Sequence, residues 1–281
     1  MTAVILPHDL LFIMPTMAHW LSYHIRPLET PDVFLARAVR PFLEKHVWPV
    51  QGARAFFVRQ ADATGLHIRL RLFGEEEMLR PAFDEWFAGR GEAEETAYQP
   101  EPERFGGPGG LRLAEEHFHL STRTVLDRLN RPYTYGDALY DGLRLHLIAV
   151  FAAEFDRQRA GWYFGQLCKQ WLPLFFQPLD TQDDPAAMRE AVIAQFEQGY
   201  APQEAELRRT LDALWTALQE KKFDREQPEW ARWLHGNQLI LNEFGENMGK
   251  ALPSLLHLTA NRLGVNNQDE VYLNYVLSKV L

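Results

Sequence analysis

Leu-His-Ile-Arg-Leu-Arg-Leu-Phe, residues 66–73, alternates apolar and polar side chains with a period of two. This alternation predicts a half-buried β-strand whose aliphatic side chains face the core, while His67, Arg69 and Arg71 face the opposite side. Two residues of strand rise separate the two arginines by roughly 6.5–7 Å. Core packing does not call for two neighbouring guanidinium groups, whereas a carboxylate or phosphate fits the fork of donors that each one offers. The run therefore predicts a small sheet, and an anion-binding surface if this face meets a substrate rather than water.

The sequence pattern changes near residue 108. Before it, strands are predicted at 20–25, 55–59, 66–73 and 96–99, with a hairpin across 62–65, and helices at 31–46, with Thr30 as cap, and at 75–88. After it the pattern is helical, at 111–130, 136–156, 160–176, 184–197, 202–222, 228–246, 249–263 and 268–280. These elements indicate an α+β fold, with a small, mostly antiparallel sheet in the N-terminal part and a large helical C-terminal part. We expect a single domain over 1–281, composed of an α/β portion at 1–108 and a helical portion at 109–281.

Composition argues against several classes of function. The net charge of −9 and the pI of about 5.6 disfavour direct binding of nucleic acid and polybasic attachment to membranes. Hydrophobic residues make up 46% of the chain, which is enough for a substantial core. Cys168 is the only cysteine, and its apolar helical surroundings predict a buried structural residue. The apolar run at 10–14 is too short to span a bilayer and does not resemble a signal peptide, so we expect a cytoplasmic protein without a membrane span.

A loop rich in proline and glycine follows the α/β portion at 98–110. Gly106 and Gly107 allow the backbone to approach a ligand closely, and Glu101 and Arg104 lie beside them in the sequence. A surface loop with an ordinary ion pair is the commoner structure for such a segment. The loop is therefore a candidate site only in combination with other segments.

Two helices carry the remaining candidate residues. Glu115 is near the start of the helix predicted at 111–130, and acidic residues in a first turn usually complement the helix dipole. In the helix predicted at 249–263, His257 and Asn261 share one face, and Arg262 follows them. A lone histidine on a helix is most often exposed or hydrogen-bonded within the protein. Each of these signals is weak when it is taken alone.

The same segments together form a family pattern. Its landmarks are Trp20 before a strand, Phe56-Phe57-Val58-Arg59, His67-Ile68-Arg69-Leu70-Arg71, Tyr98…Glu101-x-x-Arg104-Phe105-Gly106-Gly107, Ala114-Glu115-x-x-Phe118 and His257-x-x-x-Asn261-Arg262-Leu263. In order and spacing the chain resembles, over essentially its whole length, the C-terminal elimination domain of class I lanthipeptide dehydratases. That domain also occurs free-standing, under the name thiopeptide-type bacteriocin biosynthesis protein. The chain departs from the pattern at Gln60, where an aromatic residue is usual, at Phe105, which replaces tyrosine, and at Leu120, which replaces aspartate.

The resemblance implies a reaction and its partners. In the family, a larger domain uses glutamyl-tRNA to esterify Ser or Thr of a precursor peptide, and the elimination domain then expels glutamate to leave dehydroalanine or dehydrobutyrine. This chain has no room for the first domain, so the resemblance implies a lyase that works with a separate glutamyl-tRNA-dependent glutamylation protein. No step requires a cofactor or a metal, and His67 lacks the neighbours of a zinc site. A homodimer is left open.

The resemblance also implies roles for individual residues. Arg69, Arg71 and Arg104 are expected to pair the carboxylates of the glutamyl ester or the developing oxyanion. His257 is expected to move the proton, and Glu101 to orient Arg104 or His257 or to accept a proton. These groups are expected to converge around one cavity. The expected substrate-binding residues are His67, Glu115, Asn261, Arg262, Gly106 and Gly107.

Other functions fit the same scaffold. Free-standing relatives include pyridine synthases of thiopeptide pathways, which join two dehydroalanines in a formal 4+2 cycloaddition and expel the leader peptide. These enzymes tend to lose the elimination residues, so the joint presence of the arginines, Glu101 and His257 favours elimination. A non-catalytic peptide-binding subunit would instead leave the polar strand face in solvent and His257 far from Arg104. A small-anion binder could use the same arginines, but nothing in the sequence favours it.

Overall fold

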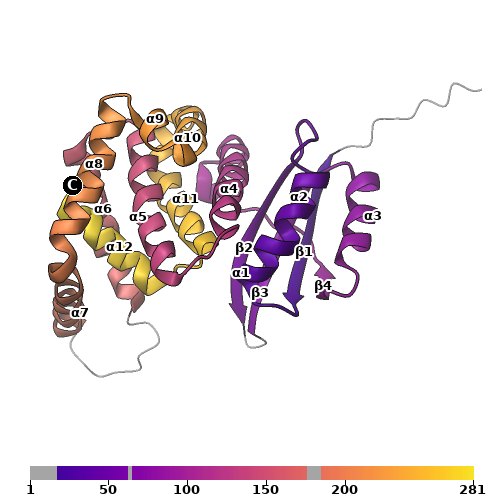
Figure 1. The fold of residues 1–281 in the computed structure, drawn as a ribbon, viewed down its shortest axis with the longest axis horizontal. Helices are drawn as coiled ribbons and strands as arrows, with labels where there is room; N and C mark the ends of the chain where they lie inside the picture. Colours follow the sequence, from indigo (N-terminus) through magenta and orange to yellow (C-terminus); the bar gives the residue numbers. More distant parts are fainter. Residues whose placement is uncertain (1–17, 63–64, 176–184) are drawn as a thin grey trace, which may run out of the picture.

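The protein is described by a computed structural model that covers residues 18–62, 65–175 and 185–281. Its strands form one four-stranded sheet in the order β2-β3-β1-β4, and every neighbouring pair is antiparallel (Figure 1). The prediction of an α+β fold with a small antiparallel sheet is confirmed. The strands are β1 His19–Pro27, β2 Arg54–Asp62, β3 Gly65–Gly74 and β4 Gly91–Glu95.

The inner strand β3 shows the predicted alternation from Ile68 onward, but not at its start, where Leu66 is 64% exposed and His67 is 2% exposed. Ile68, Leu70 and Leu72 are fully buried on one face, whereas Arg69 and Arg71 are only partly buried on the other. The helices α1 Pro31–Phe34, α2 Arg40–His46 and α3 Glu76–Phe87 cover the apolar face (Figure 1). The predicted hairpin is also confirmed, because β2 and β3 pair along their whole length; the connecting residues 63–64 lie outside the described part.

The helix predicted at 31–46 is continuous but contains an irregular turn. Between α1 and α2 the residues Leu35–Val39 are π-helical. Pro41 has no N–H to donate, so a change in the hydrogen-bond pattern just before it relieves the conflict with a regular α-helix. Thr30 occupies the predicted N-cap position, but its hydroxyl makes no capping hydrogen bond.

The prediction of a strand at 96–99 is wrong. The edge strand is β4, which ends at Glu95, and the chain has no regular secondary structure from residue 96 to residue 101. After leaving the sheet edge, this segment crosses the polar face. The ring of Tyr98 then packs against the rings of Trp20, at 5.4 Å, and Phe56, at 6.0 Å. These aromatic contacts, rather than strand pairing, determine its path.

The C-terminal part is almost wholly helical in the described residues, as predicted. Its first long helix begins at Pro108, three residues before the predicted start at 111, because proline suits the first helical position. The helices are α4 Pro108–Leu129, α5 Tyr135–Ala152, α6 Arg157–Trp171, α7 Pro185–Tyr200, α8 Glu204–Gln219, α9 Phe223–Glu226, α10 Ala231–Glu243, α11 Met248–Leu263 and α12 Asn267–Val280, with short 3-10 turns between several of them. No described helix has the combination of length and apolar composition that a bilayer crossing requires.

Helix α5 is the centre of this helical part. It begins with a capping box in which Thr134 and Asp137 satisfy each other's backbone N–H groups. The helices α6, α8, α10, α11 and α12 pack around it. Trp233 of α10 is fully buried and donates from its indole N–H to the carbonyl of Leu145, at 2.9 Å. The predicted burial of Cys168 in α6 is confirmed, and burial raises the pKa of its thiol to about 11.

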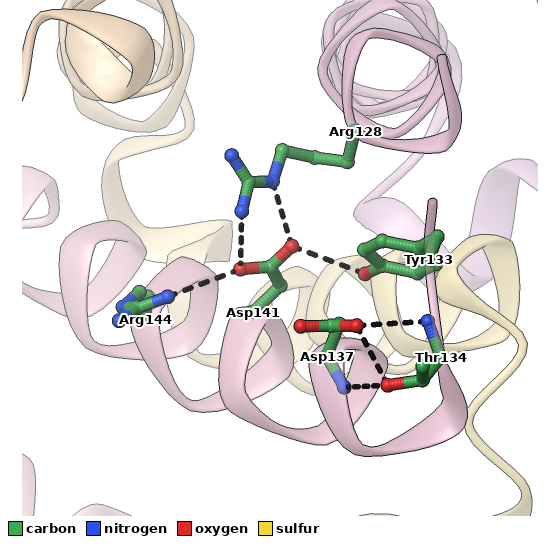
Figure 2. Close-up of polar contacts among 6 residues, drawn as sticks. All are labelled: Arg128, Tyr133, Thr134, Asp137, Asp141 and Arg144. Atoms are coloured by element: carbon green, nitrogen blue, oxygen red, sulfur yellow. Dashed lines mark hydrogen bonds and ion pairs between the residues drawn. The ribbon is translucent and has the colours of Figure 1, made fainter. Parts of the chain in front are cut away.

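A buried carboxylate joins α4 to α5 (Figure 2). Asp141 is 1% exposed and accepts two hydrogen bonds from the guanidinium of Arg128, at 2.7 and 3.1 Å. The hydroxyl of Tyr133 donates a third bond to it, at 3.1 Å, and Arg144 a fourth, at 3.3 Å. These bonds fix the turn between the two helices, since removing the carboxylate would leave buried donors without a partner.

Side chains of two helices pair with the outer edge of β2. The N–H of Ala55 donates to His119 of α4, at 3.0 Å, and the N–H of Phe57 donates to Thr122, at 3.4 Å. Asn261 of α11 both accepts from the N–H of Arg59 and donates to its carbonyl, each at 2.9 Å. Helical side chains thus take the place of a fifth strand and attach the sheet to the helical part.

Candidate active site

The glycine loop places Arg104 against helix α11. The loop folds into the 3-10 turn Pro102–Phe105, which ends at Gly106 in a left-handed conformation. The Nε of Arg104 donates to the hydroxyl of Ser254, at 2.7 Å, and its Nη1 donates to Glu101, at 3.1 Å. The side chain is 40% exposed, and its Nη2 has no partner among the described residues. Arg104 is therefore oriented from two sides while one edge of its guanidinium stays available to an anion.

One turn further along α11, His257 forms a hydrogen bond with a buried carboxylate. Its Nδ1 lies 2.7 Å from Oε2 of Glu270, which comes from α12 and is 1% exposed. Burial raises the pKa of Glu270, and the hydrogen bond from His257 opposes that rise. A carboxylate at Nδ1 keeps a proton on that nitrogen and leaves Nε2 as the basic atom of the ring. The rings of Trp171 and His257 form a T-shaped contact with their centroids 5.6 Å apart, which limits rotation of the imidazole.

Arg104 and His257 line the same hollow. It has a volume of about 520 Å³, and Lys250, Ser254 and Glu270 also border it. A non-catalytic subunit would hold Arg104 and His257 far apart. The structure instead gives one small cavity two cationic side chains, a hydroxyl and an imidazole.

A longer groove meets this hollow at His257. The groove has a volume of about 860 Å³ and runs between the end of the β2–β3 hairpin and the start of α12. His67 and Asn261, both expected substrate-binding residues, line it. His257 and Asn267 line both cavities, so the groove and the hollow adjoin at the imidazole, and the two together are called the depression below.

The strand arginines lie on the polar face of β3 and line neither of these cavities. The guanidinium of Arg71 lies 4.8 Å from the ring of Tyr98 and 5.3 Å from the ring of Phe56. Neither Arg69 nor Arg71 forms an ion pair with a described residue, and the Nε of each is buried without a partner. The expectation of one shared cavity therefore holds for Arg104 and His257, whereas the strand arginines form a neighbouring cationic surface.

Arg262 is fully buried behind that surface. Its Nη1 donates to the carbonyl of Leu258, at 2.9 Å, and its guanidinium lies 5.0 Å from the ring of Phe118. Its Nε and Nη2 have no partner among the described residues. Burial and the neighbouring Arg71 lower the pKa of Arg262 to about 9, which still leaves the group protonated at neutral pH. Arg262 is therefore a buried residue that lines neither the groove nor the hollow, and the expectation that it binds substrate directly is wrong.

Glu115 has surroundings that the sequence did not predict. Because α4 begins at Pro108, Glu115 lies in the third turn, and the expected interaction with the helix dipole does not apply. It is 7% exposed, and burial raises the pKa of its carboxyl. Hydrogen bonds from Tyr98 and Trp20 and the charge of Arg54 oppose that rise. Glu115 thus holds the aromatic residues that cover the polar face of the sheet.

The two glycines of the loop differ in what surrounds them. A Cβ on Gly106 would lie 2.3 Å from the Asn247 side chain, and its φ of +86° disfavours other residues. A Cβ on Gly107, whose φ is +98°, would meet nothing within 4 Å. Gly106 is therefore needed for the tight turn that carries Arg104, and only Gly107 has open space beside it.

Sequence reasoning missed Glu270 and Ser254, which hold the two central side chains. Glu270 follows His257 by thirteen positions on a different helix, so no periodicity connects the two. The one available signal is a glutamate followed by the apolar residues Val271 and Leu273 in the predicted helix at 268–280. In the part of the chain that is described, no group of three or more His, Cys, Asp or Glu side chains is placed to hold a metal ion.

Comparisons with known proteins agree with this architecture. Residues 20–281 match the model of the family described as "Lantibiotic biosynthesis dehydratase C-term". No curated protein sequence matches the chain significantly.

Several solved structures are similar to the chain. "Pyridine synthase, TbtD, from thiomuracin biosynthesis" has a TM-score of 0.71 and 14% identity, over 93% of this chain and 97% of that one. TsrL has a TM-score of 0.67 and 17% identity, over 94% of each chain. The tRNA-dependent lantibiotic dehydratase MibB from Microbispora sp. 107891 has a TM-score of 0.58 and 20% identity, over 93% of this chain and 28% of that one. At these identities the similarity shows a shared fold.

Proposed function

Because the chain belongs to the family of lantibiotic dehydratase C-terminal domains, we propose that it is a lyase that eliminates glutamate from glutamylated Ser or Thr of a ribosomal precursor peptide. A separate glutamyl-tRNA-dependent protein supplies the glutamylated peptide. The observation that carries the proposal is the hollow shared by Arg104 and His257, in which buried Glu270 orients the imidazole.

The geometry suits each step of a β-elimination. Nε2 of His257 removes the α-proton of the esterified residue, and the electrons of that C–H bond form the double bond to Cβ. The bond between Cβ and the ester oxygen breaks, and glutamate leaves as a carboxylate, which needs no proton. In this proposal the edge of Arg104 that is not held by Ser254 and Glu101 pairs the departing carboxylate. Glu270 stabilises the imidazolium until His257 returns its proton to solvent.

The neighbouring cationic surface supports the same reaction. The carbanion formed at Cα shares its charge with the peptide carbonyl oxygen, and positive groups beside that oxygen stabilise it. Arg69 and Arg71 form no ion pair with a described residue, and the charge of Glu115 acts on Arg71 without a direct contact. Because both arginines line neither cavity, in this proposal their positive charge acts on the substrate from outside the two cavities. Glu101 keeps Arg104 turned toward the hollow. In this proposal Arg69 and Arg71 stabilise charge, and Glu101 is a positioning residue.

Mass spectrometry of a reaction with a peptide that carries one O-glutamyl serine tests the proposal. The wild-type protein should release one glutamic acid per site. R104A and H257A should accumulate the glutamylated peptide, with rates reduced by about 10²- to 10⁴-fold. The matched control is R112A, which removes an exposed arginine that pairs with Glu116 and Glu243 outside both cavities. Elimination at the wild-type rate by the R104A/H257A double variant would refute the mechanism, and a macrocycle with loss of the leader peptide would indicate a pyridine synthase instead.

A further inference from the structure

Side chains from α4 and α11 cover the outer edge of β2 only as far as Arg59. Positions 55, 57 and 59 point their backbone groups away from β3, and each has a partner on α4 or α11. By the two-residue repeat of a strand, Ala61 points its N–H and C=O in the same direction. Neither group has a partner among the described residues. Ala61 lines the long groove, so the one uncovered position of this edge opens into it.

The lining of the groove is rich in amides and poor in available charge. Gln60, Asn267 and Gln268 line it, and their side chains have no hydrogen-bond partner among the described residues. The Arg59 guanidinium, which also borders the groove, is occupied by the carbonyl of Arg262, at 2.9 Å, and by the carboxylate of Asp32, at 2.6 Å. Free amides together with an open strand edge match a neutral peptide backbone, which offers donors and acceptors in alternation.

The hollow beyond His257 has the opposite character. Arg104 and Lys250 give it two positive side chains, and Lys250 forms no ion pair with a described residue. A carboxylate suits this hollow, whereas the groove offers nothing comparable to an anion. The depression is thus divided at the imidazole into a neutral arm and a cationic arm.

We infer that the long groove binds the precursor peptide as an extended strand, which pairs with the edge of β2 at Ala61 and uses the free amides, while the glutamyl group enters the cationic hollow. This inference rests on the proposed function for the direction of the substrate. Recognition through backbone groups makes binding insensitive to most side chains of the peptide. It also places the esterified residue at the junction of the two arms, beside His257.

The variant A61P tests the pairing. Proline removes only the N–H that points into the groove, and the inward bonds of β2 to β3 come from the neighbouring positions. The matched control is A93P, because Ala93 is exposed on β4 at the opposite edge of the sheet. Circular dichroism and thermal unfolding establish that both variants are folded. Should A61P fail to fold, N267A and Q268A probe the same groove without touching the sheet.

Two readouts are needed, and the first involves no chemistry. A fluorescein-labelled decapeptide of alanine and glycine with one unmodified serine is titrated with each protein, and anisotropy gives Kd. The A61P variant should bind about five- to tenfold more weakly than wild type and A93P, as expected for one lost hydrogen bond. The second readout compares kcat/KM for the O-glutamylated decapeptide with kcat/KM for N-acetyl-O-glutamylserine N-methylamide. Wild type should prefer the decapeptide, and A61P should lose most of that preference.

The outcomes separate this inference from the proposed function. If the wild-type protein does not bind the decapeptide, or if A61P binds it as tightly as A93P does, the groove inference is overturned even when R104A and H257A abolish elimination. If A61P weakens binding of the decapeptide but the wild-type protein does not eliminate glutamate, the inference about the groove is supported and the proposed reaction is refuted.

Discussion

Replacing Glu270 by glutamine tests whether the buried carboxylate positions the imidazole of His257. Glutamine has nearly the same volume, so the packing of α12 is preserved. Its amide can still accept a hydrogen bond from Nδ1, but it carries no charge to stabilise the imidazolium, and its NH₂ group can favour the wrong tautomer. We therefore expect E270Q to fold normally and to eliminate glutamate slowly.

The size of the effect follows from the contact that is lost. The bond between Nδ1 of His257 and Oε2 of Glu270 is 2.7 Å long. Hydrogen bonds to charged groups contribute about 1.5–3 kcal/mol. At about 1.4 kcal/mol per factor of ten, the rate of elimination should fall by about 10- to 150-fold. The double variant E270Q/H257A should be no slower than H257A, because the carboxylate acts only through the imidazole.

The same substitution should not lower the free energy of unfolding. Burial raises the pKa of Glu270, so the ionised carboxylate destabilises the folded protein increasingly as the pH rises above the carboxyl's unfolded-state pKa. Glutamine removes this charge, and E270Q should be at least as stable as wild type to urea at pH 7. The assays are single-turnover elimination between pH 5 and pH 9 and equilibrium unfolding in urea. The positioning role would be refuted if E270Q eliminated glutamate at the wild-type rate. It would also be refuted if the free energy of unfolding fell by as much as the activation free energy of elimination rose.

Three further predictions concern stability and are checked by urea denaturation. D141A should lose about 3–5 kcal/mol, because it leaves the buried donors of Arg128 and Tyr133 without a partner, and a loss below 1 kcal/mol would contradict the arrangement in Figure 2. G106A should be less stable than G107A, since both glycines have a positive φ but only the Cβ at 106 would collide with Asn247; equal losses would show that the loop adapts. Stability should fall as the pH drops from 6.5 toward 4, because burial lowers the pKa of His146 to about 4 and keeps it neutral in the folded state. The free energy of unfolding of H146Q should therefore depend less steeply on pH. An unchanged slope would exclude this histidine as the cause.

The fold was predictable where the signal is local. The alternation at 66–73 and the apolar periods between prolines determine which face of each element is buried, and the corresponding elements are found. The edge strand β4 was not predictable, because Gly-Glu-Ala-Glu-Glu has no bulky apolar or β-branched residue and little β-propensity. This segment is a strand because β1 offers it an unpaired edge, which depends on tertiary structure. The residues at 96–99 have a higher β-propensity, but here the ring of Tyr98 packs against the ring of Trp20 instead.

The site shows the same division. The charge and type of Arg104 and His257 single them out in the sequence, and the family pattern brings them together. Their partners could not be found in this way, because Ser254 is a common helix residue and Glu270 resembles any acidic residue in a helix. The hydrogen bonds at 2.7 Å to these two partners exist only after α11 has packed against the loop and α12. The burial of Arg262 is likewise a tertiary effect, since no sequence period places a guanidinium between Phe56 and Phe118.

Helix α11 sets the distances within the site, because a single rigid element carries its main anchors. Asn261 holds the edge of β2, His257 lies at the junction of the two cavities, and Ser254 holds Arg104. At 1.5 Å of rise per residue, His257 and Asn261 are separated by about 6 Å along the helix axis, and His257 and Ser254 by about 4.5 Å. The first spacing corresponds to about two residues of extended peptide, at about 3.3 Å each. The second is comparable to the length of a glutamyl side chain.

These spacings lead to a prediction about the substrate rather than the protein. If the peptide pairs with β2 beyond Asn261, its contacts with the strand edge begin about two residues from the esterified serine. N-methylation of a single peptide amide removes one donor, so methylation two to four residues away on one side should lower kcat/KM about fivefold, as expected for one hydrogen bond. Methylation at the same distance on the other side should have little effect, because only one arm of the depression has a strand edge. Equal sensitivity on both sides, or none on either, would show that α11 does not direct the peptide in this way.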